Sequence, residues 1–335
     1  MAFENKTLGE LLGDPRIGKI AADAIRMRDL SQEDLWHKTL GQLKEMHFGG
    51  EIGDGFVRLF AAAETGDWYF PLYSEKECAE DGARKGVNAV WLPSAEAGAD
   101  RKPFILLVPG GGFVNVWNLT EGWPVAAQFN RLGYHVLILT YQVEGEERLL
   151  DKNMEDFARA LRLIRDNREH FHVDPDRYMT CGFSAGGYLV CLWNTPGKGY
   201  AAFGLPKPEA CIPVYPFVSP KLELTREQDG EEDEEDENWD IRLYGCPVRE
   251  AVKQDFEIPE HAEGFPPSAF FLAAGDELVN PDHSRILAAA LEKHSIPCRL
   301  EIGPEGGHGF ADGSGMCMAG WTERAVRWTE SLSGR

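Results

Sequence analysis

The sequence lacks the features that would anchor or direct a chain to a membrane. No apolar stretch approaches the roughly 18 residues that a bilayer-spanning helix needs, and residues 1–20 carry no charged start followed by an apolar segment. We therefore expect no membrane partner, no signal peptide and a cytoplasmic location. The seven cysteines show no Cys-x-x-Cys pair and no metal-type spacing with histidine. Their odd number argues against a complete disulfide framework, so we expect reduced thiols and no metal site.

Basic residues are scarce relative to acidic ones. The 335 residues include 34 lysines and arginines against 55 aspartates and glutamates, which gives a formal net charge of −21. Nucleic acids and anionic membranes both require positive protein surface, so this charge disfavours both as partners. It also disfavours anionic substrates, unless the binding pocket is locally basic. A hydrophobic fraction of 43% and nine tryptophans indicate a substantial core, enough for one large α/β domain with additions or for two domains.

The most informative motif is Gly-x-Ser-x-Gly at residues 182–186. It lies between apolar runs at 178–181 and 188–193, which predicts a turn from a strand into a helix. Glycine tolerates so tight a turn because it has no Cβ, and the turn raises the hydroxyl of Ser184 above the sheet edge. The motif is typical of the nucleophile elbow of a serine hydrolase. A glycine-rich turn that binds phosphate is the alternative.

A hydrolase of this kind needs an acid and a histidine that follow the serine along the chain. An apolar strand at 268–274 ends at a glycine and is followed by Asp276, where an open α/β sheet carries its functional groups. Asp276 is therefore the predicted acid, with Glu277 and Asp282 as rivals and helix capping as its alternative role. His308 is the predicted base, because it alone of the nine histidines lies in a glycine-lined loop after the last predicted strand.

A third motif predicts hydrogen-bond donors for an oxyanion. The continuous apolar run at 104–108 predicts a strand buried on both faces, and it leads into Pro109 and three glycines. Glycines let backbone N–H groups approach a bound carbonyl with no side chain between them. The candidate donors are the N–H groups of Gly111 and Gly112, together with that of Ala185, which follows the serine. A flexible loop or an anion-binding nest is the alternative.

Stretches along most of the chain resemble one known family. They are residues 108–113, 123–126, 132–136, 139–141, 173–177, 181–187, 275–279 and 307–310. At these stretches the chain resembles the acetyl-xylan-esterase-like and feruloyl-esterase-like α/β-hydrolases, near the hormone-sensitive-lipase branch. The resemblance implies an α/β-hydrolase fold, a triad of Ser184, Asp276 and His308, and hydrolysis of short acyl esters, often acetyl groups on sugars.

The chain departs from that family in two places. Related lipases often have a histidine before the three glycines, where this chain has Pro109. In the family an arginine often precedes the acid of the next loop, whereas here Thr120 precedes Glu121 and Trp123 replaces a common second acid. Because this loop borders the pocket, the departures leave the identity of the substrate open.

Residues 1–85 are predicted to form an N-terminal helical extension. Its first 65 residues or so are predicted to be helical and separate from the core. The helical runs begin at Leu8 and at Ser31 or span 17–27 and 56–63. Strands are expected at 68–73 and 87–92. The extension is either a cap over the active site or a packing surface, and a homodimer through it is an open alternative.

Residues 86–335 are predicted to form the catalytic domain. Strands and helices alternate there, which indicates a mostly parallel central sheet flanked by helices and so an α/β fold. Residues 222–245 form an acidic insertion, and the like charges of its block at 229–240 predict a solvated, mobile segment. A lid that grips a cationic partner or calcium is the alternative.

Together these motifs predict a serine carboxylesterase acting on short-chain acyl esters, acetyl esters above all, with carbohydrate esters as candidates. Ser184 attacks the ester carbonyl, His308 acts as base and then as acid, Asp276 orients His308, and water hydrolyses the acyl-enzyme. The mechanism requires no metal or organic cofactor, and the expected partner is a small ester. An exopeptidase or amidase of the same fold would share every catalytic residue, although such enzymes usually carry a propeller domain that this chain is too short to hold. A non-catalytic interaction protein on this fold is the third alternative.

Overall fold

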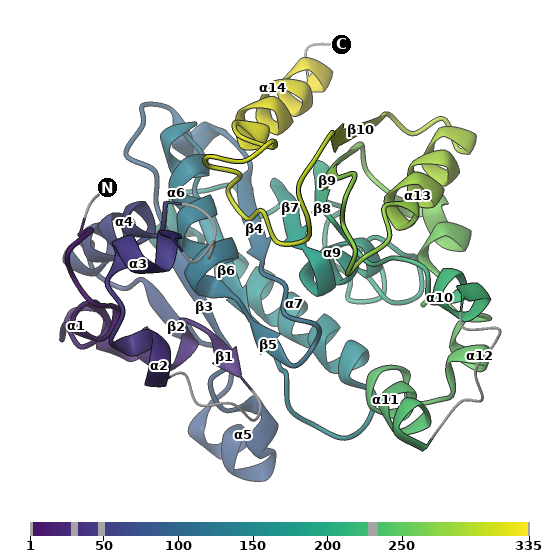
Figure 1. The fold of residues 1–335 in the computed structure, drawn as a ribbon, viewed down its shortest axis with the longest axis horizontal. Coiled ribbons are helices and arrows are strands. Elements are labelled where there is room, and N and C mark those ends of the chain that lie inside the picture. Colours follow the sequence, from purple (N-terminus) through teal and green to yellow (C-terminus); the bar gives the residue numbers. More distant parts are fainter. Residues whose placement is uncertain (1–2, 28–32, 46–50, 227–233, 334–335) are drawn as a thin grey trace.

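The computed structural model describes residues 3–27, 33–45, 51–226 and 234–333. Its centre is an eight-stranded sheet with the order β10-β9-β8-β7-β4-β6-β3-β2 (Figure 1). Strand β3 pairs antiparallel with both neighbours and the other pairs are parallel, which confirms the predicted, mostly parallel sheet. The strands are β2 Tyr69–Pro71, β3 Asn88–Leu92, β4 Phe104–Val108, β6 Val136–Thr140, β7 Tyr178–Phe183, β8 Ala210–Val214, β9 Ser268–Ala273 and β10 Cys298–Gly303.

The inner strands form where the sequence is apolar on both faces. Every residue of β3, β4, β6, β7, β8 and β9 is buried, as expected of strands covered by helices on two sides. The last strand, β10, lies at the edge and is only partly buried.

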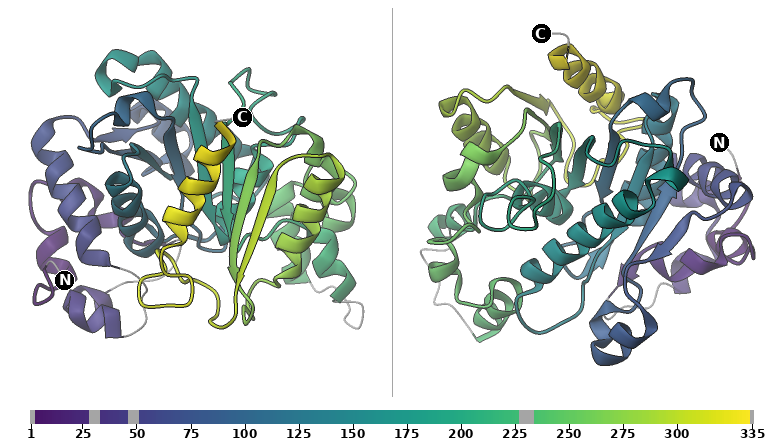
Figure 2. Two further views of the ribbon diagram at one scale, coloured as in Figure 1. Left: turned by 90° about the horizontal axis from the view of Figure 1, so that it is seen from above. Right: turned by 180° about the vertical axis from the view of Figure 1, so that it is seen from behind.

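Helices cover both faces of the sheet (Figure 2). On one face α6, Trp123–Arg131, contacts β3 and β6, and α14, Trp321–Ser333, contacts α6 and β9. On the other face α9, Ser184–Leu192, contacts β4, β7 and β8, and α7, Leu149–Asp166, packs on α9. Helix α13, Asp282–Lys293, contacts β9 and β10, and the short α8, Arg168–Phe171, follows α7.

The N-terminal helices belong to the core of the sheet domain, so the expectation that they stand apart is wrong. Leu8, Leu11, Phe56 and Leu59 are buried in the same hydrophobic cluster as the central strands, because helix α4 packs along α6. The sheet also begins inside the predicted extension, with β2. The helices are α1 Leu8–Leu12, α2 Glu33–Trp36, α3 Leu40–Glu45, α4 Ile52–Thr65 and α5 Glu75–Glu80, and capping boxes start α1 and α5.

The helix predicted at 17–27 is replaced by a 3-10 turn, Gly18–Asp23, and a short strand, β1 Arg26–Met27. Strand β1 pairs antiparallel with β5, Asn115–Val116, in the loop after the three glycines. The Leu119 N–H donates to the Ala24 carbonyl at 2.7 Å, so the backbone of this segment pairs with the loop instead of closing helical turns. Ser31, the predicted start of the third helix, lies outside the described residues.

Part of the acidic insertion is helical. Helices α10, Pro220–Arg226, α11, Glu234–Tyr244, and α12, Val248–Ala251, connect β8 to β9, and residues 227–233 lie outside the described ranges. Buried Arg242 of α11 donates to the carbonyls of Phe113 and Val143 at 2.9 and 2.7 Å. The second half of the insertion is therefore tied to the domain.

Three further observations concern the described part of the chain. No helix in it is long and apolar enough to cross a bilayer. All seven cysteines are free thiols. Within the same ranges, no group of three or more His, Cys, Asp or Glu side chains is arranged to hold a metal ion.

The contact between α4 and α6 depends on a glycine. A Cβ at Gly55 would lie 2.7 Å from the Cβ of Trp123 and 3.0 Å from the nitrogen of Pro124. Replacing glycine by alanine in a helix normally stabilises it by about 1 kcal/mol, so any loss must come from packing. We expect Gly55→Ala to lower the free energy of unfolding by about 1–2 kcal/mol in urea denaturation.

Gly82→Ala is the matched control, because no atom lies within 4 Å of a Cβ at Gly82. Its free energy of unfolding should stay within about 0.5 kcal/mol of wild type. A Gly55→Ala protein as stable as this control would contradict the close approach of α4 to α6.

Candidate active site

Ser184 lies in a strained turn between β7 and α9. It is the first residue of α9, follows β7 directly and has a φ of +49°, a conformation that is uncommon for non-glycine residues and clusters at functional sites. A Cβ at Gly182 would collide with the Gly186 carbonyl, and a Cβ at Gly186 would collide with the Val108 carbonyl. Both glycines of the motif are therefore sterically required, and the predicted turn from strand to helix is present.

Asp276 and His308 are joined by a short hydrogen bond. His308 Nδ1 lies 2.7 Å from Asp276 Oδ2, and the two side chains are 15% and 2% exposed. The other carboxylate oxygen accepts the N–H groups of Leu278 and Val279 at 3.1 and 2.9 Å, so the loop after β9 fixes its orientation. A carboxylate only accepts hydrogen bonds, so Nδ1 carries the proton and Nε2 remains as a base.

The rival acids are placed elsewhere. Glu277 is exposed, and Asp282, the first residue of α13, accepts a hydrogen bond from Arg285 at 2.7 Å. The Asp276 and His308 loops touch, since a Cβ at Gly275 would lie 2.7 Å from the Gly306 carbonyl oxygen. Of the three candidate acids, Asp276 is the one hydrogen-bonded to the histidine.

The glycine loop after β4 borders the serine. Gly111 and Gly112 have φ values of +136° and +59°, which favour glycine. The Gly111 carbonyl accepts the N–H groups of Val114 and Asn115 at 3.1 and 2.8 Å, which closes the turn. Ala185 lies in the first turn of α9, where backbone N–H groups have no partner within the helix. The three predicted oxyanion donors are thus next to Ser184, and their role stays a prediction.

A carboxyl group that the sequence analysis did not assign to the site is part of it. Glu121 lies in a π-helical turn, Asn118–Gly122, and is buried. Its Oε2 accepts the N–H of Gly110 at 2.6 Å, and its Oε1 accepts the hydroxyl of Tyr215 at 2.8 Å. Burial raises the pKa of Glu121, while the two hydrogen bonds and the nearby His308 oppose this shift.

Tyr215 connects Glu121 to the histidine loop. It follows β8 directly, and its hydroxyl oxygen accepts the N–H of Ala311 at 3.2 Å. The centre of its ring lies 4.7 Å from that of the His308 imidazole. Burial, reinforced by the Glu121 charge, raises the pKa of Tyr215 well above its usual range, so the hydroxyl keeps its proton and donates a hydrogen bond to the carboxylate.

Backbone strain gathers around this site. Eight non-glycine residues of the described chain have positive φ values, and four of them, Phe113, Ser184, Tyr215 and Ala311, lie in the loops just described. Each such conformation costs on the order of 1–3 kcal/mol and persists only where neighbouring contacts hold it. The Tyr215–Ala311 hydrogen bond and the contact of Arg242 with the Phe113 carbonyl supply such contacts.

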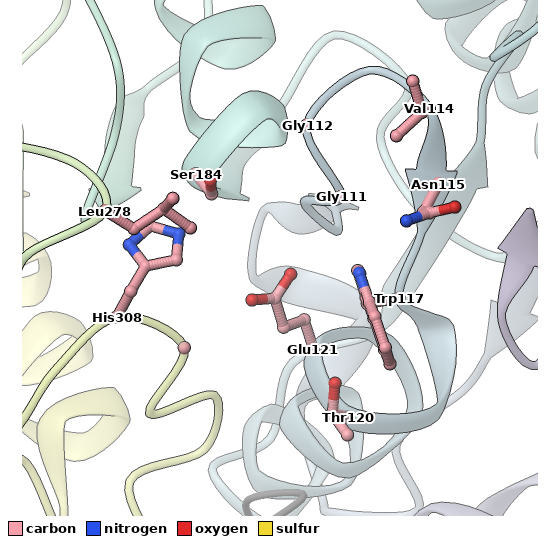
Figure 3. Close-up of a pocket in the computed structure, with 11 residues that line it drawn as sticks. Gly111, Gly112, Val114, Asn115, Trp117, Thr120, Glu121, Ser184, Leu278 and His308 are labelled. Carbon is pink, nitrogen blue, oxygen red and sulfur yellow. The ribbon is translucent and has the colours of Figure 1, made fainter. Parts of the chain in front are cut away.

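These groups surround one cavity of about 470 Å³, a size that suits a small ligand. In Figure 3 Ser184 and His308 lie together on one side, Trp117 and Thr120 lie opposite, and the Glu121 carboxylate lies between them. The lining residues are Gly111, Gly112, Val114, Asn115, Trp117, Thr120, Glu121, Ser184, Leu278, His308 and Gly309. Among its described residues, the N-terminal extension reaches this wall through β1 and its pairing with β5.

Glu121 and Tyr215 were not predicted as site residues, and the sequence contains a signal for one of them. Tyr215 stands directly after the apolar run 210–214, which forms parallel strand β8, and Asp276 was assigned from the same kind of position. Glu121 was noted as an acid in a loop near the pocket, but nothing local indicates that its carboxylate turns back toward the glycine loop. That placement depends on the π-helical turn, which periodicity does not predict.

Comparison with known proteins gives consistent results. Residues 90–200 match the BD-FAE family model. The chain is 26% identical over 219 residues to an acetylxylan esterase of Xylanibacter ruminicola, covering 63% of this chain and 41% of that protein. It is 25% identical over 248 residues to endo-1,4-beta-xylanase B of Butyrivibrio fibrisolvens, covering 70% of this chain and 36% of that protein. The chain thus spans less than half the length of these two relatives.

The fold resembles that of solved esterases. An acetyl ester-xyloside bifunctional hydrolase from Caldicellulosiruptor lactoaceticus superimposes with a TM-score of 0.63 at 25% identity, over 79% of this chain and 96% of that one. These matches confirm the predicted α/β-hydrolase fold and the resemblance to acetyl-xylan-esterase-like proteins.

The Asp276–His308 hydrogen bond predicts a spectroscopic signal. A proton held between Nδ1 and a buried carboxylate should give a strongly downfield imidazole N–H resonance in ¹H NMR spectra. We expect the resonance to disappear in Asp276→Ala and in His308→Gln, and to persist in Asp282→Ala. Its presence in Asp276→Ala would show that another acid orients the histidine.

Proposed function

We propose that this chain, which has the α/β-hydrolase fold and matches the BD-FAE family model at residues 90–200, is a serine carboxylesterase hydrolysing short-chain acyl esters. One observation carries this proposal: His308, which is hydrogen-bonded to Asp276 at 2.7 Å, lines the same cavity as Ser184 and two positive-φ glycines. This arrangement supports the assignment of Ser184 as nucleophile, His308 as base, Asp276 as orienting acid and the glycine loop as the source of oxyanion donors.

Each group then has a defined role in acyl transfer. His308 Nε2 takes the Ser184 proton as Oγ attacks the ester carbonyl, and Asp276 stabilises the resulting imidazolium. The N–H groups of Gly111, Gly112 and Ala185 stabilise the tetrahedral oxyanion. The histidine returns the proton to the leaving alkoxide, and a water molecule activated by the same base hydrolyses the acyl-enzyme.

An acetyl ester of a carbohydrate is the substrate class that we favour. The cavity, at about 470 Å³, has room for a short acyl group and one sugar-sized alcohol. Its wall opposite His308 combines an aromatic ring, Trp117, with the polar side chains of Asn115 and Thr120, a combination that suits a ring bearing hydroxyl groups. The acetyl-specific names of two similar proteins support the same class.

The pocket favours uncharged esters. Among the described residues that line it, Glu121 and His308 are the acidic and basic side chains, and none is lysine or arginine. The condition under which an anionic substrate would be accepted, a locally basic pocket, is therefore not met. The net charge of −21 adds a repulsive field.

Replacement of the triad residues tests the mechanism. With p-nitrophenyl acetate we expect Ser184→Ala to lose on the order of 10⁴-fold or more in kcat and Asp276→Asn to lose about 10⁴-fold. Asp282→Asn, which changes the rival acid at the start of α13, should retain wild-type kcat. Full activity of folded Ser184→Ala would exclude the serine mechanism.

Acyl preference tests the substrate class in a separate experiment. Because the cavity is small, kcat/KM should fall in the order p-nitrophenyl acetate, butyrate, octanoate. Equal or higher activity on the octanoate would overturn the short-chain assignment. Hydrolysis of the corresponding acetanilide at a comparable rate would favour an amidase instead.

A matched pair of acyl groups tests the electrostatic preference. The monosuccinate and the butyrate of p-nitrophenol have four-carbon acyl chains that differ by one carboxylate. We expect kcat/KM for the succinate to be at least about tenfold lower at low ionic strength, with the gap narrowing as salt screens the repulsion. A succinate hydrolysed as fast as the butyrate would show that the pocket accepts anions.

A further inference from the structure

The proposed reaction needs two loops held in fixed relation, and they come from strands that are far apart in the sheet. The glycine loop follows β4, the histidine loop follows β10, and β7, β8 and β9 lie between them. Interactions that stabilise a transition state require donors placed within a few tenths of an ångström. Some contact across the carboxyl edge of the sheet must therefore fix the two loops.

A chain of three hydrogen bonds spans this gap. On the glycine side, the Gly110 N–H donates to Glu121 Oε2 at 2.6 Å. On the histidine side, Ala311 lies three residues after His308. Its N–H donates to the Tyr215 hydroxyl at 3.2 Å. The Tyr215 hydroxyl joins the two sides by donating to Glu121 Oε1 at 2.8 Å.

We propose that Glu121 is a positioning residue that fixes the oxyanion loop relative to the His308 loop, with Tyr215 as the link between them. This inference rests on the proposed esterase reaction, to which it adds a residue. Glu121 accepts the Gly110 N–H on one oxygen and the Tyr215 hydroxyl on the other, a task that requires a carboxylate because an amide has one acceptor oxygen.

The steric environment of Gly110 supports this role. A Cβ at Gly110 would lie 2.9 Å from the Cβ of Ser184 and 3.0 Å from Glu121 Oε2. The carboxylate and the side chain of Ser184 therefore both border the space that a side chain at Gly110 would occupy. By holding the Gly110 N–H, Glu121 sets the course of the backbone into Gly111 and Gly112.

The strained backbone on the other side supports it as well. Tyr215 and Ala311 both have positive φ values, +37° and +47°, and the hydrogen bond between them is one end of the chain. The Tyr215 ring also packs against the rings of His308 and Phe310, with both centroids 4.7 Å away. A shift of the Tyr215 hydroxyl would therefore move the histidine loop.

Three variants separate positioning from general stability. Glu121→Leu removes both acceptor oxygens, and Glu121→Gln keeps one acceptor oxygen for the Gly110 N–H. Tyr215→Phe removes the hydroxyl that links the two sides but keeps the aromatic ring. We expect kcat on p-nitrophenyl acetate to fall on the order of 10²-fold for Glu121→Leu and about tenfold for each milder variant. KM should stay within about threefold, because the interaction acts on the transition state.

Tyr73→Phe is the matched control. Tyr73 is another buried tyrosine whose hydroxyl donates to a buried carboxylate, Asp156, at 2.7 Å, and it does not line the cavity. It should lose stability to a similar extent as Tyr215→Phe but keep wild-type kcat. The double variant Glu121→Leu/Tyr215→Phe should be no slower than Glu121→Leu alone, because the two residues act in one chain.

Labelling by a fluorophosphonate distinguishes failure of this inference from failure of the proposed function. The probe reacts with an activated serine and requires the oxyanion donors, but no ester substrate. If wild type is labelled yet hydrolyses no ester, the function is wrong, and slower labelling of the Glu121 and Tyr215 variants still supports the positioning role. The inference is overturned if folded Tyr215→Phe and Glu121→Gln keep wild-type kcat and labelling rates, or if KM alone changes. If Glu121→Leu does not fold, these two variants decide.

Discussion

Five neighbouring parallel strands, β10, β9, β8, β7 and β4, end at the same edge of the sheet, and the candidate site follows from that register. The loops after these strands carry, in the same spatial order, His308, Asp276, Tyr215, Ser184 and the three glycines. Residues from five distant parts of the sequence meet because backbone hydrogen bonds hold the strands in register. Ligands of open α/β sheets bind at this edge for the same reason.

Close approach of the backbone is the second requirement at this edge. Gly186 lies against the carbonyls of Val108 and Pro109, and Gly110 lies against Ser184, so α9 can start directly beneath the end of β4. The N-terminal segment and the acidic insertion hold the glycine loop from outside, through β1 pairing with β5 and through Arg242. These additions to the sheet therefore bear on the site, although none of their described residues lines the cavity next to the serine.

Much of this arrangement could be predicted from the sequence, because its signals are local. The run at 104–108 predicts a buried strand by its composition alone, and a glycine two residues either side of Ser184 has a steric cause that needs no other part of the fold. Asp276 and His308 could be placed at strand ends, and the structure brings them to 2.7 Å. Their catalytic roles, like those of Gly111, Gly112 and Ala185, stay predictions.

The features that could not be predicted depend on tertiary contacts. Apolar residues such as Leu8 and Phe56 show that a helix has a buried face, but not that this face joins the core of the sheet. The local pattern of residues 17–27 predicts a helix. It cannot show the strand pairing, because the partner of residues 26–27, at 115–116, is almost ninety positions later in the sequence. Glu121 could not be assigned a role, because its partners, Gly110 and Tyr215, are brought to it by two different strands.

The central claim is that Ser184 is a nucleophile whose oxyanion is held by the glycine loop. The most direct test is a crystal structure of the protein after inactivation by a small alkyl phosphonate. We predict a covalent bond from Ser184 Oγ to phosphorus, with the phosphoryl oxygen within about 2.7–3.1 Å of the Gly111, Gly112 or Ala185 nitrogens. A phosphonate bound to another residue, or a phosphoryl oxygen turned away from these nitrogens, would contradict the account.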